Sequence, residues 1–215
     1  MKGLILTSYY QVYRSIFAYT GLAILLSGII LYFGDSSIHG LAAMFIILLM
    51  TLPATEVIKL EAKSGYNNYV LTLPVSRRDI VKSHYLFYLI ILIAGALLCN
   101  VIFYFYNLIS ETPVANIFNV TSFGVFIVLF AGSIIYPLLY AFGPEKSDAI
   151  VIGSGLGGLF ATIGSQSLIG YLITQFSITS INLSVFISTI YLLLGIAFYS
   201  FSYFISAFIY QRKEF

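Results

Sequence analysis

The stretch HYLFYLIILIAGALLCNVIFYFYNLI, residues 84–109, decides the fold, because it is apolar over nearly its whole length and contains no Asp, Glu, Lys or Arg. A helix needs about 20 such residues to cross the ~30 Å hydrocarbon core of a bilayer. Backbone polar groups in hydrocarbon must pair with one another, and a helix pairs them within a single segment. Residues 84–109 are therefore predicted to form a transmembrane helix.

Five more apolar stretches of comparable length flank this segment, at residues 16–33, 38–55, 119–142, 149–175 and 183–210. Of the 215 residues, 60% are hydrophobic and only 8% are charged, whereas soluble domains average about a quarter charged. The sequence therefore predicts an all-α membrane protein with six transmembrane helices. Residues 1–215 are expected to form one transmembrane domain with no separate soluble domain.

The distribution of basic residues predicts the orientation, since Lys and Arg accumulate in cytoplasmic segments. If the N-terminus is cytoplasmic, the outer turns contain Asp35, His39 and Glu111 but no Lys or Arg. Every basic residue then lies inside, and both termini are predicted to be cytoplasmic. These inside residues are Lys2, Arg14, Lys59, Lys63, Arg77, Arg78, Lys82, Lys146, Arg212 and Lys213.

Two features are expected at the membrane surface. Apolar residues recur at helical spacing within residues 1–15, while Lys2 and Arg14 lie largely elsewhere, which is typical of an amphipathic helix in the inner interface. The alternative is a tilted extension of the first span. Because the chain has no Trp, tyrosines near predicted boundaries, including Tyr140 and Tyr210, are expected to form the interfacial aromatic belt.

The sequence contains no motif with which the chain could drive transport by itself, either by ion coupling or by ATP hydrolysis. No predicted span carries Asp, Glu, Lys or Arg near its middle, which disfavours a transporter coupled to protons or sodium. No G-x-x-x-x-G-K-[ST] phosphate loop occurs either. The chain is therefore not predicted to hydrolyse ATP or to bind a cofactor itself.

Catalytic and metal chemistry are also disfavoured. Gly153-Ser154-Gly155 resembles part of a serine-nucleophile turn, but no histidine follows His84 to act as its base. The other histidine, His39, is predicted on the opposite side, and Cys99 is the only cysteine, so no metal site is expected. A net charge of +2 gives no basic surface for nucleic acid.

Glycines mark the segment 149–175. Gly153 and Gly157 form a small-xxx-small pair, which lets helix backbones approach closely in lipid, and Gly164 follows. This pattern predicts close helix packing or a seam between two copies. A hinge that moves during gating is the alternative.

The longest polar stretch, residues 56–83, is predicted to be cytoplasmic. Its first part extends the second span as a charged helix, and residues 64–68 are expected to break that helix. Ser76 followed by Asp79 is typical of a helix start, so a second helix should begin at Arg77 and run into the third span. The resulting elbow would suit the docking of a partner. The alternative is that its basic residues only fix the topology.

Two segments resemble a known family. YVLTLPVSRRDIVKSHY, residues 69–85, is similar to a signature of ABC-2 type exporter permeases. YPLLYAFGPEK, residues 136–146, is similar to a second segment of the group that contains the membrane subunits of the staphylococcal phenol-soluble modulin exporter. His84, Ala141 and Asp148 stand where that group commonly has Lys, Lys and Arg.

The resemblance implies a partner for each cytoplasmic loop. The elbow would be a coupling segment received by a separate ABC ATPase, which binds ATP and Mg²⁺, and the loop at 143–148 would make a second contact. Two permeases, identical or different, would work with two ATPases in the cell membrane of a Gram-positive bacterium. The implied coupling residues are Glu61, Leu73, Pro74, Arg77, Arg78 and Asp79 in the first contact, and Glu145 and Lys146 in the second.

The resemblance also implies a cargo, namely amphipathic cytolytic peptides exported from the cell. An apolar bundle would equally suit export of lipids or drugs. A different class of function is a non-transporting membrane subunit that confers immunity or serves a sensor.

Overall fold

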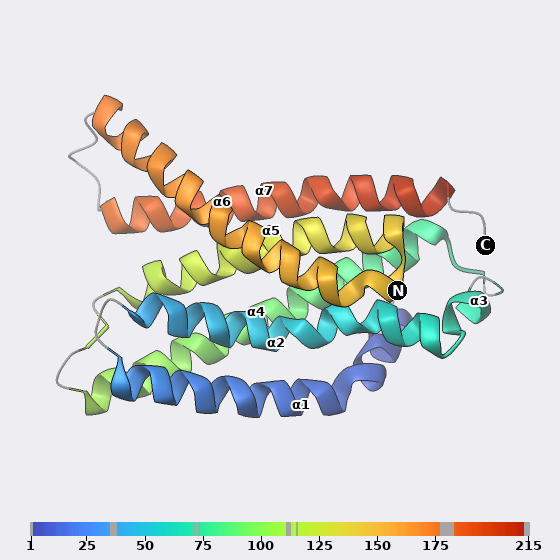
Figure 1. Ribbon diagram of the computed structural model, residues 1–215, viewed down its shortest axis with the longest axis horizontal. Helices are drawn as coiled ribbons and strands as arrows, with labels where there is room; N and C mark the ends of the chain where they lie inside the picture. Colours follow the sequence, from blue (N-terminus) through green and yellow to red (C-terminus); the bar gives the residue numbers. More distant parts are fainter. Residues whose placement is uncertain are drawn as a thin grey trace.

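The computed structural model describes residues 2–34, 38–70, 72, 74–110, 113–114, 116–176 and 183–212. Six long helices are apolar enough to cross a membrane, as predicted (Figure 1). The described residues contain no strand. The long helices are α1 (Lys2–Phe33), α2 (His39–Lys63), α4 (Arg77–Ile109), α5 (Ile117–Phe142), α6 (Ser147–Phe176) and α7 (Leu183–Arg212). Between them lie the short helix α3 (Tyr66–Val70) and the 3₁₀ turn η2 (Pro144–Lys146).

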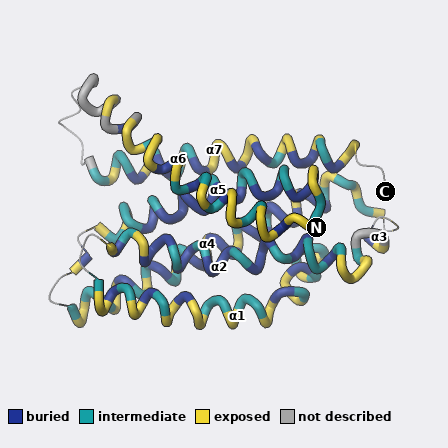
Figure 2. The backbone as a smooth tube through the Cα atoms, in the orientation of Figure 1, coloured by how far each residue is buried: buried dark blue, intermediate teal, exposed yellow. Residues whose placement is uncertain are grey.

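Helices α2 and α5 form the centre of the bundle. Helix α2 packs against α1, α4 and α5, and α5 also packs against α4, α6 and α7. Figure 2 shows the buried positions concentrated where these central helices meet. On the outer helices, large apolar side chains such as Phe17 and Phe160 are about three-quarters exposed. Such an extensive apolar surface indicates contact with lipid rather than water.

The N-terminal residues are helical, as predicted, but they continue into the first span without interruption. Helix α1 runs from Lys2 to Phe33, because no Gly or Pro breaks the sequence between Leu4 and Thr20. Figure 1 shows its first turns lying at an angle to the rest of α1. Ser8 and Val12 are buried there, and Tyr9 is exposed. Residues 2–15 are thus the first turns of α1 rather than a separate element.

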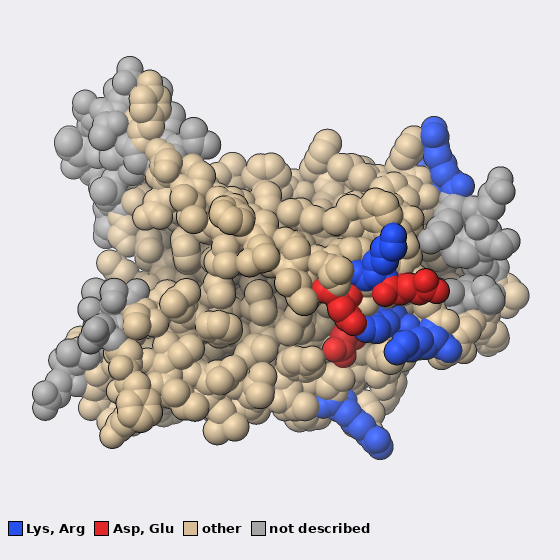
Figure 3. Space-filling view, viewed as in Figure 1, with Lys and Arg blue, Asp and Glu red and all other residues tan. Residues whose placement is uncertain are grey.

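The charged side chains gather at one end of the bundle, which Figure 3 shows for the visible face. This charged end comprises the start of α1, the end of α2, the start of α4, η2 and the end of α7. Both ends of the described chain therefore lie on the same side. That the charged end faces the cytoplasm stays a prediction from the distribution of Lys and Arg.

Two tyrosines expected in the interfacial belt point into the bundle instead. Tyr140 and Tyr210 are only 4% and 5% exposed, and their ring centroids lie 5.2 Å apart. The prediction that they belong to the interfacial belt is wrong, because both rings are enclosed between helices of this chain.

Candidate functional site

The predicted elbow connects α2 to α4 at the charged end. Helix α2 ends at Lys63, and Gly65 turns the chain with a φ of +72°, a conformation that favours glycine. Helix α4 begins at Arg77 behind the cap Ser76. The Ser76 hydroxyl accepts the Asp79 backbone N–H at 3.1 Å and donates to the Asp79 carboxylate at 2.7 Å. The predicted cap is confirmed.

The elbow is tied to the last helix. Arg77 Nη1 donates to the carbonyl oxygen of Gln211, near the end of α7, at 3.1 Å. Pro74 and Arg78 are exposed. Leu73, another implied coupling residue, lies outside the described residues. The elbow thus combines an exposed outer surface with an anchor on α7.

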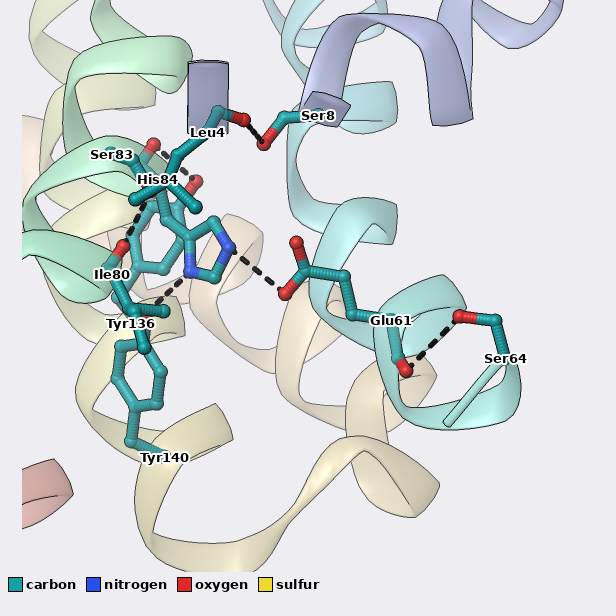
Figure 4. A network of polar contacts seen from close by, with 9 residues as sticks. All are labelled: Leu4, Ser8, Glu61, Ser64, Ile80, Ser83, His84, Tyr136 and Tyr140. Carbon is teal, nitrogen blue, oxygen red and sulfur yellow. Dashed lines mark hydrogen bonds and ion pairs between the residues drawn. The ribbon is translucent and has the colours of Figure 1, made fainter. Parts of the chain in front are cut away.

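Glu61, implied by resemblance to touch a partner, is buried inside this chain. Its carboxylate Oε2 lies 3.1 Å from His84 Nε2, and both side chains are about 95% buried (Figure 4). This pair joins the end of α2 to the start of α4. The sequence predicts Glu61 on the charged helical extension of the second span and His84 at the inner start of the third, and it does not pair them. The surface position of Glu61 is wrong, because its carboxylate turns inward to the His84 ring.

His84 also contacts α5. Its Nδ1 lies 2.7 Å from the Tyr140 hydroxyl, and the Tyr136 hydroxyl donates to the His84 carbonyl oxygen at 3.4 Å. A neutral imidazole that donates from Nε2 to Glu61 can accept from Tyr140 at Nδ1, whereas a protonated one donates from both nitrogens. In either state both ring nitrogens have partners. The Glu61–His84–Tyr140 network therefore links α2, α4 and α5 directly below the elbow (Figure 4).

A cluster of buried tyrosines continues from this network toward α7. The Tyr85 hydroxyl lies 2.7 Å from the hydroxyls of both Ser202 and Ser206. The Tyr199 hydroxyl donates to the Tyr85 carbonyl oxygen at 3.0 Å. The Tyr88 hydroxyl donates to a backbone carbonyl of α5 at 2.7 Å. These bonds satisfy buried hydroxyls while fixing α4 against α5 and α7.

The second loop has its own link to α2. After Gly143, whose φ is +87°, η2 exposes Glu145 and Lys146 at the charged end. Two residues later, Asp148 Oδ1 lies 2.7 Å from Lys59 Nζ. The end of α2 is thus connected to α4 through Glu61 and to the start of α6 through Lys59. The sequence does not reveal this second pair, because its partners stand 89 positions apart in the chain.

An apolar cavity of about 360 Å³ lies between α2, α5 and α6. The hydroxyls of Thr51, Thr55 and Tyr88 border it, and each already donates to a backbone carbonyl. The remaining lining is apolar, so the cavity offers its occupant hydrocarbon contact and little hydrogen bonding. Its wall includes Leu48, Leu52, Ile135, Ile152, Gly155 and Leu156.

The glycines of α6 divide into two groups. A Cβ added to Gly157 would meet Ile134 at 3.4 Å, and one added to Gly158 would meet the Ile127 carbonyl oxygen at 3.0 Å. These two lie against α5, and Gly158 makes the closer approach. An added Cβ at Gly153 or Gly164 would meet nothing within 4 Å. Packing inside this chain therefore does not explain Gly153 and Gly164, because both face open space.

Metal ligands do not converge among the described residues. No group of three or more His, Cys, Asp or Glu side chains lies close enough there to hold an ion. Cys99 is buried and lies 3.8 Å from the Thr121 hydroxyl.

Six long apolar helices with their charges at one end define a multi-pass helical membrane protein. A family model described as ABC-2 family transporter protein matches residues 3–211. The chain therefore belongs to the ABC-2 family of transporter proteins, and the predicted resemblance is confirmed at that level. No curated protein and no solved structure matches the chain.

ABC-2 permeases are membrane subunits that are generally not catalytic themselves, and they generally work with an ABC ATPase and form dimers. The finer resemblance, to the membrane subunits of the phenol-soluble modulin exporter, stays a prediction.

Proposed function

We propose that this chain is the membrane-spanning permease subunit of an ATP-driven exporter, with ATP and Mg²⁺ bound by a separate ABC ATPase. One observation carries the proposal beyond family membership. The elbow and the η2 loop both lie at the charged end. The Glu61–His84 pair connects the end of α2 to α4, which follows the elbow, and the Lys59–Asp148 pair connects it to α6, which follows η2. A force applied to either loop would therefore reach the centre of the bundle.

The ATPase contact is best assigned to the exposed part of each loop. In the elbow these residues are Pro74 and Arg78, with Leu73 included by resemblance. In the second loop they are Glu145 and Lys146. The other implied coupling residues have contacts inside the chain, so we assign them a supporting role. Arg77 holds the elbow to α7, Asp79 bonds to the Ser76 cap of α4, and Glu61 holds α2 to α4.

The mechanism we propose is a rigid-body movement. Closure of two ATPases on ATP would push both loops, and the connected helices would rock relative to a second permease. Gly153 and Gly164 on the open face of α6 are our candidates for the seam between the two permeases, since small residues permit close helix contact in lipid.

The proposed cargo is an amphipathic cytolytic peptide, exported through the cell membrane of a Gram-positive bacterium. This assignment rests on the family resemblance, and the apolar cavity between α2, α5 and α6 is compatible with it. The apolar side chains of such a peptide would meet a wall whose hydroxyls are already hydrogen-bonded. Lipids and drugs would meet the same wall, so transport assays should include all three cargo classes.

Copurification with a candidate ABC ATPase tests the ATPase contact. Pro74→Arg adds a long charged side chain at an exposed elbow position, which should prevent docking into a cleft while leaving the bundle folded. Gly3→Arg is the matched control, because it adds the same side chain at the charged end where nothing lies within 4 Å. We expect Pro74→Arg to lose the ATPase and Gly3→Arg to retain it. Retention by both variants would contradict the elbow assignment.

A further inference from the structure

A groove runs between α4 and α7 from the charged end into the membrane region. It consists of three hollows of about 250, 310 and 480 Å³. The first two share Tyr203 and Phe204, and the second and third share Leu89, Tyr199 and Ser200. Because neighbouring hollows share walls, they form one path along the two helices.

Basic side chains lie at the mouth of this groove, which is its opening at the charged end of the bundle. Arg78 lines the first hollow and Lys82 the second, and the two exposed residues lie about one helical turn apart on α4. Neither has an ion pair or a hydrogen bond with another described residue. Arg212 at the end of α7 lies 4.0 Å from the ring centroid of Phe208, which also lines the first hollow. The mouth therefore has cations that the described residues leave without an acidic partner.

Beyond the mouth the groove is apolar. Its α4 wall follows one helix face through Leu86, Leu89, Ile93 and Leu97. At about 1.5 Å per residue, the path from Lys82 to Leu97 is about 22 Å long, within the ~30 Å hydrocarbon core. A cationic mouth and a long apolar path match an amphiphile with an anionic head and hydrocarbon chains.

We propose that this groove binds an anionic phospholipid from the leaflet at the charged end. Arg78 and Lys82 hold the phosphate, and an acyl chain lies along the α4–α7 wall. Basic pockets between transmembrane helices are suited to anionic head groups, because each nearby Lys or Arg attracts the lipid's negative charge. Tyr203 lines the two hollows nearest the mouth, and its hydroxyl makes no hydrogen bond with another described residue, so it is available to donate to an oxygen of the bound lipid.

This site is independent of the proposed exporter function, since it needs only a membrane and the geometry of α4 and α7. Arg78 is also part of the proposed ATPase contact, whereas Lys82 is not. Lys82 is therefore the residue for testing the lipid site. An effect of Lys82 substitution on lipid binding, with ATPase copurification unchanged, separates the two proposals.

Native mass spectrometry of the purified full chain tests lipid binding directly. The protein is mixed with phosphatidylglycerol or phosphatidylcholine, and the dissociation constant of the first retained lipid is measured for each. We expect phosphatidylglycerol to bind more tightly. Lys82→Gln should weaken phosphatidylglycerol binding about fivefold, because one favourable charge is removed. Lys63→Gln, which removes a charge from the same end but outside the groove, should leave binding unchanged.

A second pair of variants tests the acyl path. Ser200→Phe fills the wall shared by two hollows with a large side chain, and should weaken binding of both phospholipids. Ala18→Phe places the same side chain on the exposed face of α1 and should not. Glycerol 3-phosphate, which has the charge without the chains, should fail to displace the lipid. Equal affinity for the two phospholipids, equal loss with Lys63→Gln, or displacement by glycerol 3-phosphate would overturn the proposal.

Discussion

His84 Nε2 lies 3.1 Å from Glu61 Oε2, at a depth where both side chains are about 95% buried. The two residues stand on opposite sides of the elbow, Glu61 near the end of α2 and His84 in the second turn of α4. Their contact joins the two helices that flank the elbow, inside the bundle. The elbow is thus held between a polar pair below it and the Arg77–Gln211 bond beside it.

Removing His84 should destabilise the fold more than removing Glu61. His84→Leu leaves a buried carboxylate without its partner, which typically costs about 3–5 kcal/mol. Glu61→Leu leaves the His84 ring its contact with Tyr140, so the cost is that of one lost hydrogen bond, about 1–3 kcal/mol. Chemical denaturation of the purified variants in detergent measures both losses.

The double variant Glu61→Leu/His84→Leu supplies the control for this pair. Replacing both buried polar partners by apolar groups is often nearly neutral, so the double variant should be more stable than His84→Leu alone. Simple addition of the two single losses would show that the residues do not interact.

The fold could be predicted well from sequence because hydrophobic length determines it. Six apolar stretches of sufficient length predicted six helices, and the Ser76–Asp79 spacing predicted the start of α4. The sequence does not determine whether the N-terminal residues form a separate helix. Their amphipathic pattern fits both a separate helix and an extension, and only the unbroken backbone of α1 distinguishes the two.

The side-chain contacts of the site could not be predicted, because they depend on which helix faces lie together. Glu61 and His84 are near each other in sequence, yet their pairing requires the elbow to fold back. Lys59 and Asp148 are separated by two complete spans, α4 and α5. The burial of Tyr140 and Tyr210 has the same cause, since a boundary position in sequence does not reveal whether a side chain points inward.

Gly132 permits the close contact of α5 with Tyr88, so Gly132→Ala should destabilise the bundle. An added Cβ would lie 2.8 Å from Tyr88 Cε1, and Tyr88 is held by its bond to α5. Overpacking of this kind costs about 1–3 kcal/mol. Gly21→Ala on α1 is the control, because nothing lies within 4 Å of its added Cβ. Thermal unfolding in detergent should distinguish the variants, and equal melting temperatures would contradict the packing.

Cysteine labelling can determine the orientation, since Cys99 is the only native cysteine and is buried. In a Cys99→Ala background, Ser64→Cys at the charged end should be protected from a membrane-impermeant maleimide in intact cells. Ser110→Cys at the opposite end should be labelled. The expectation follows from the concentration of Lys and Arg at the charged end. Labelling of Ser64→Cys before permeabilisation would reverse the proposed orientation and with it the ATPase contact.

The Lys59–Asp148 pair should matter for coupling more than for stability. Asp148 is largely exposed, and exposed ion pairs contribute little to folding. Reversing one charge, in Lys59→Asp or Asp148→Lys, should reduce cargo-stimulated ATP turnover by the reconstituted complex, because α2 and α6 would repel each other beside the second loop. The double variant restores opposite charges and should recover much of the turnover. If all three variants show the same turnover as the unmodified chain, the pair does not transmit movement.

Filling the apolar cavity between α2, α5 and α6 tests whether cargo enters it. Gly155 lines it, and an added Cβ there would meet nothing within 4 Å, so Gly155→Leu should fill cavity space without straining the fold. If cargo side chains enter this cavity, Gly155→Leu should reduce stimulation of ATP turnover by an amphipathic peptide while basal turnover is retained. Ser167→Leu places the same side chain on an exposed position of α6 outside the cavity and should behave like the unmodified chain. Undiminished stimulation by the peptide in Gly155→Leu would exclude the cavity from the cargo path. If the variant reduces stimulation by a lipid or a drug but not by the peptide, the cargo class is a lipid or a drug.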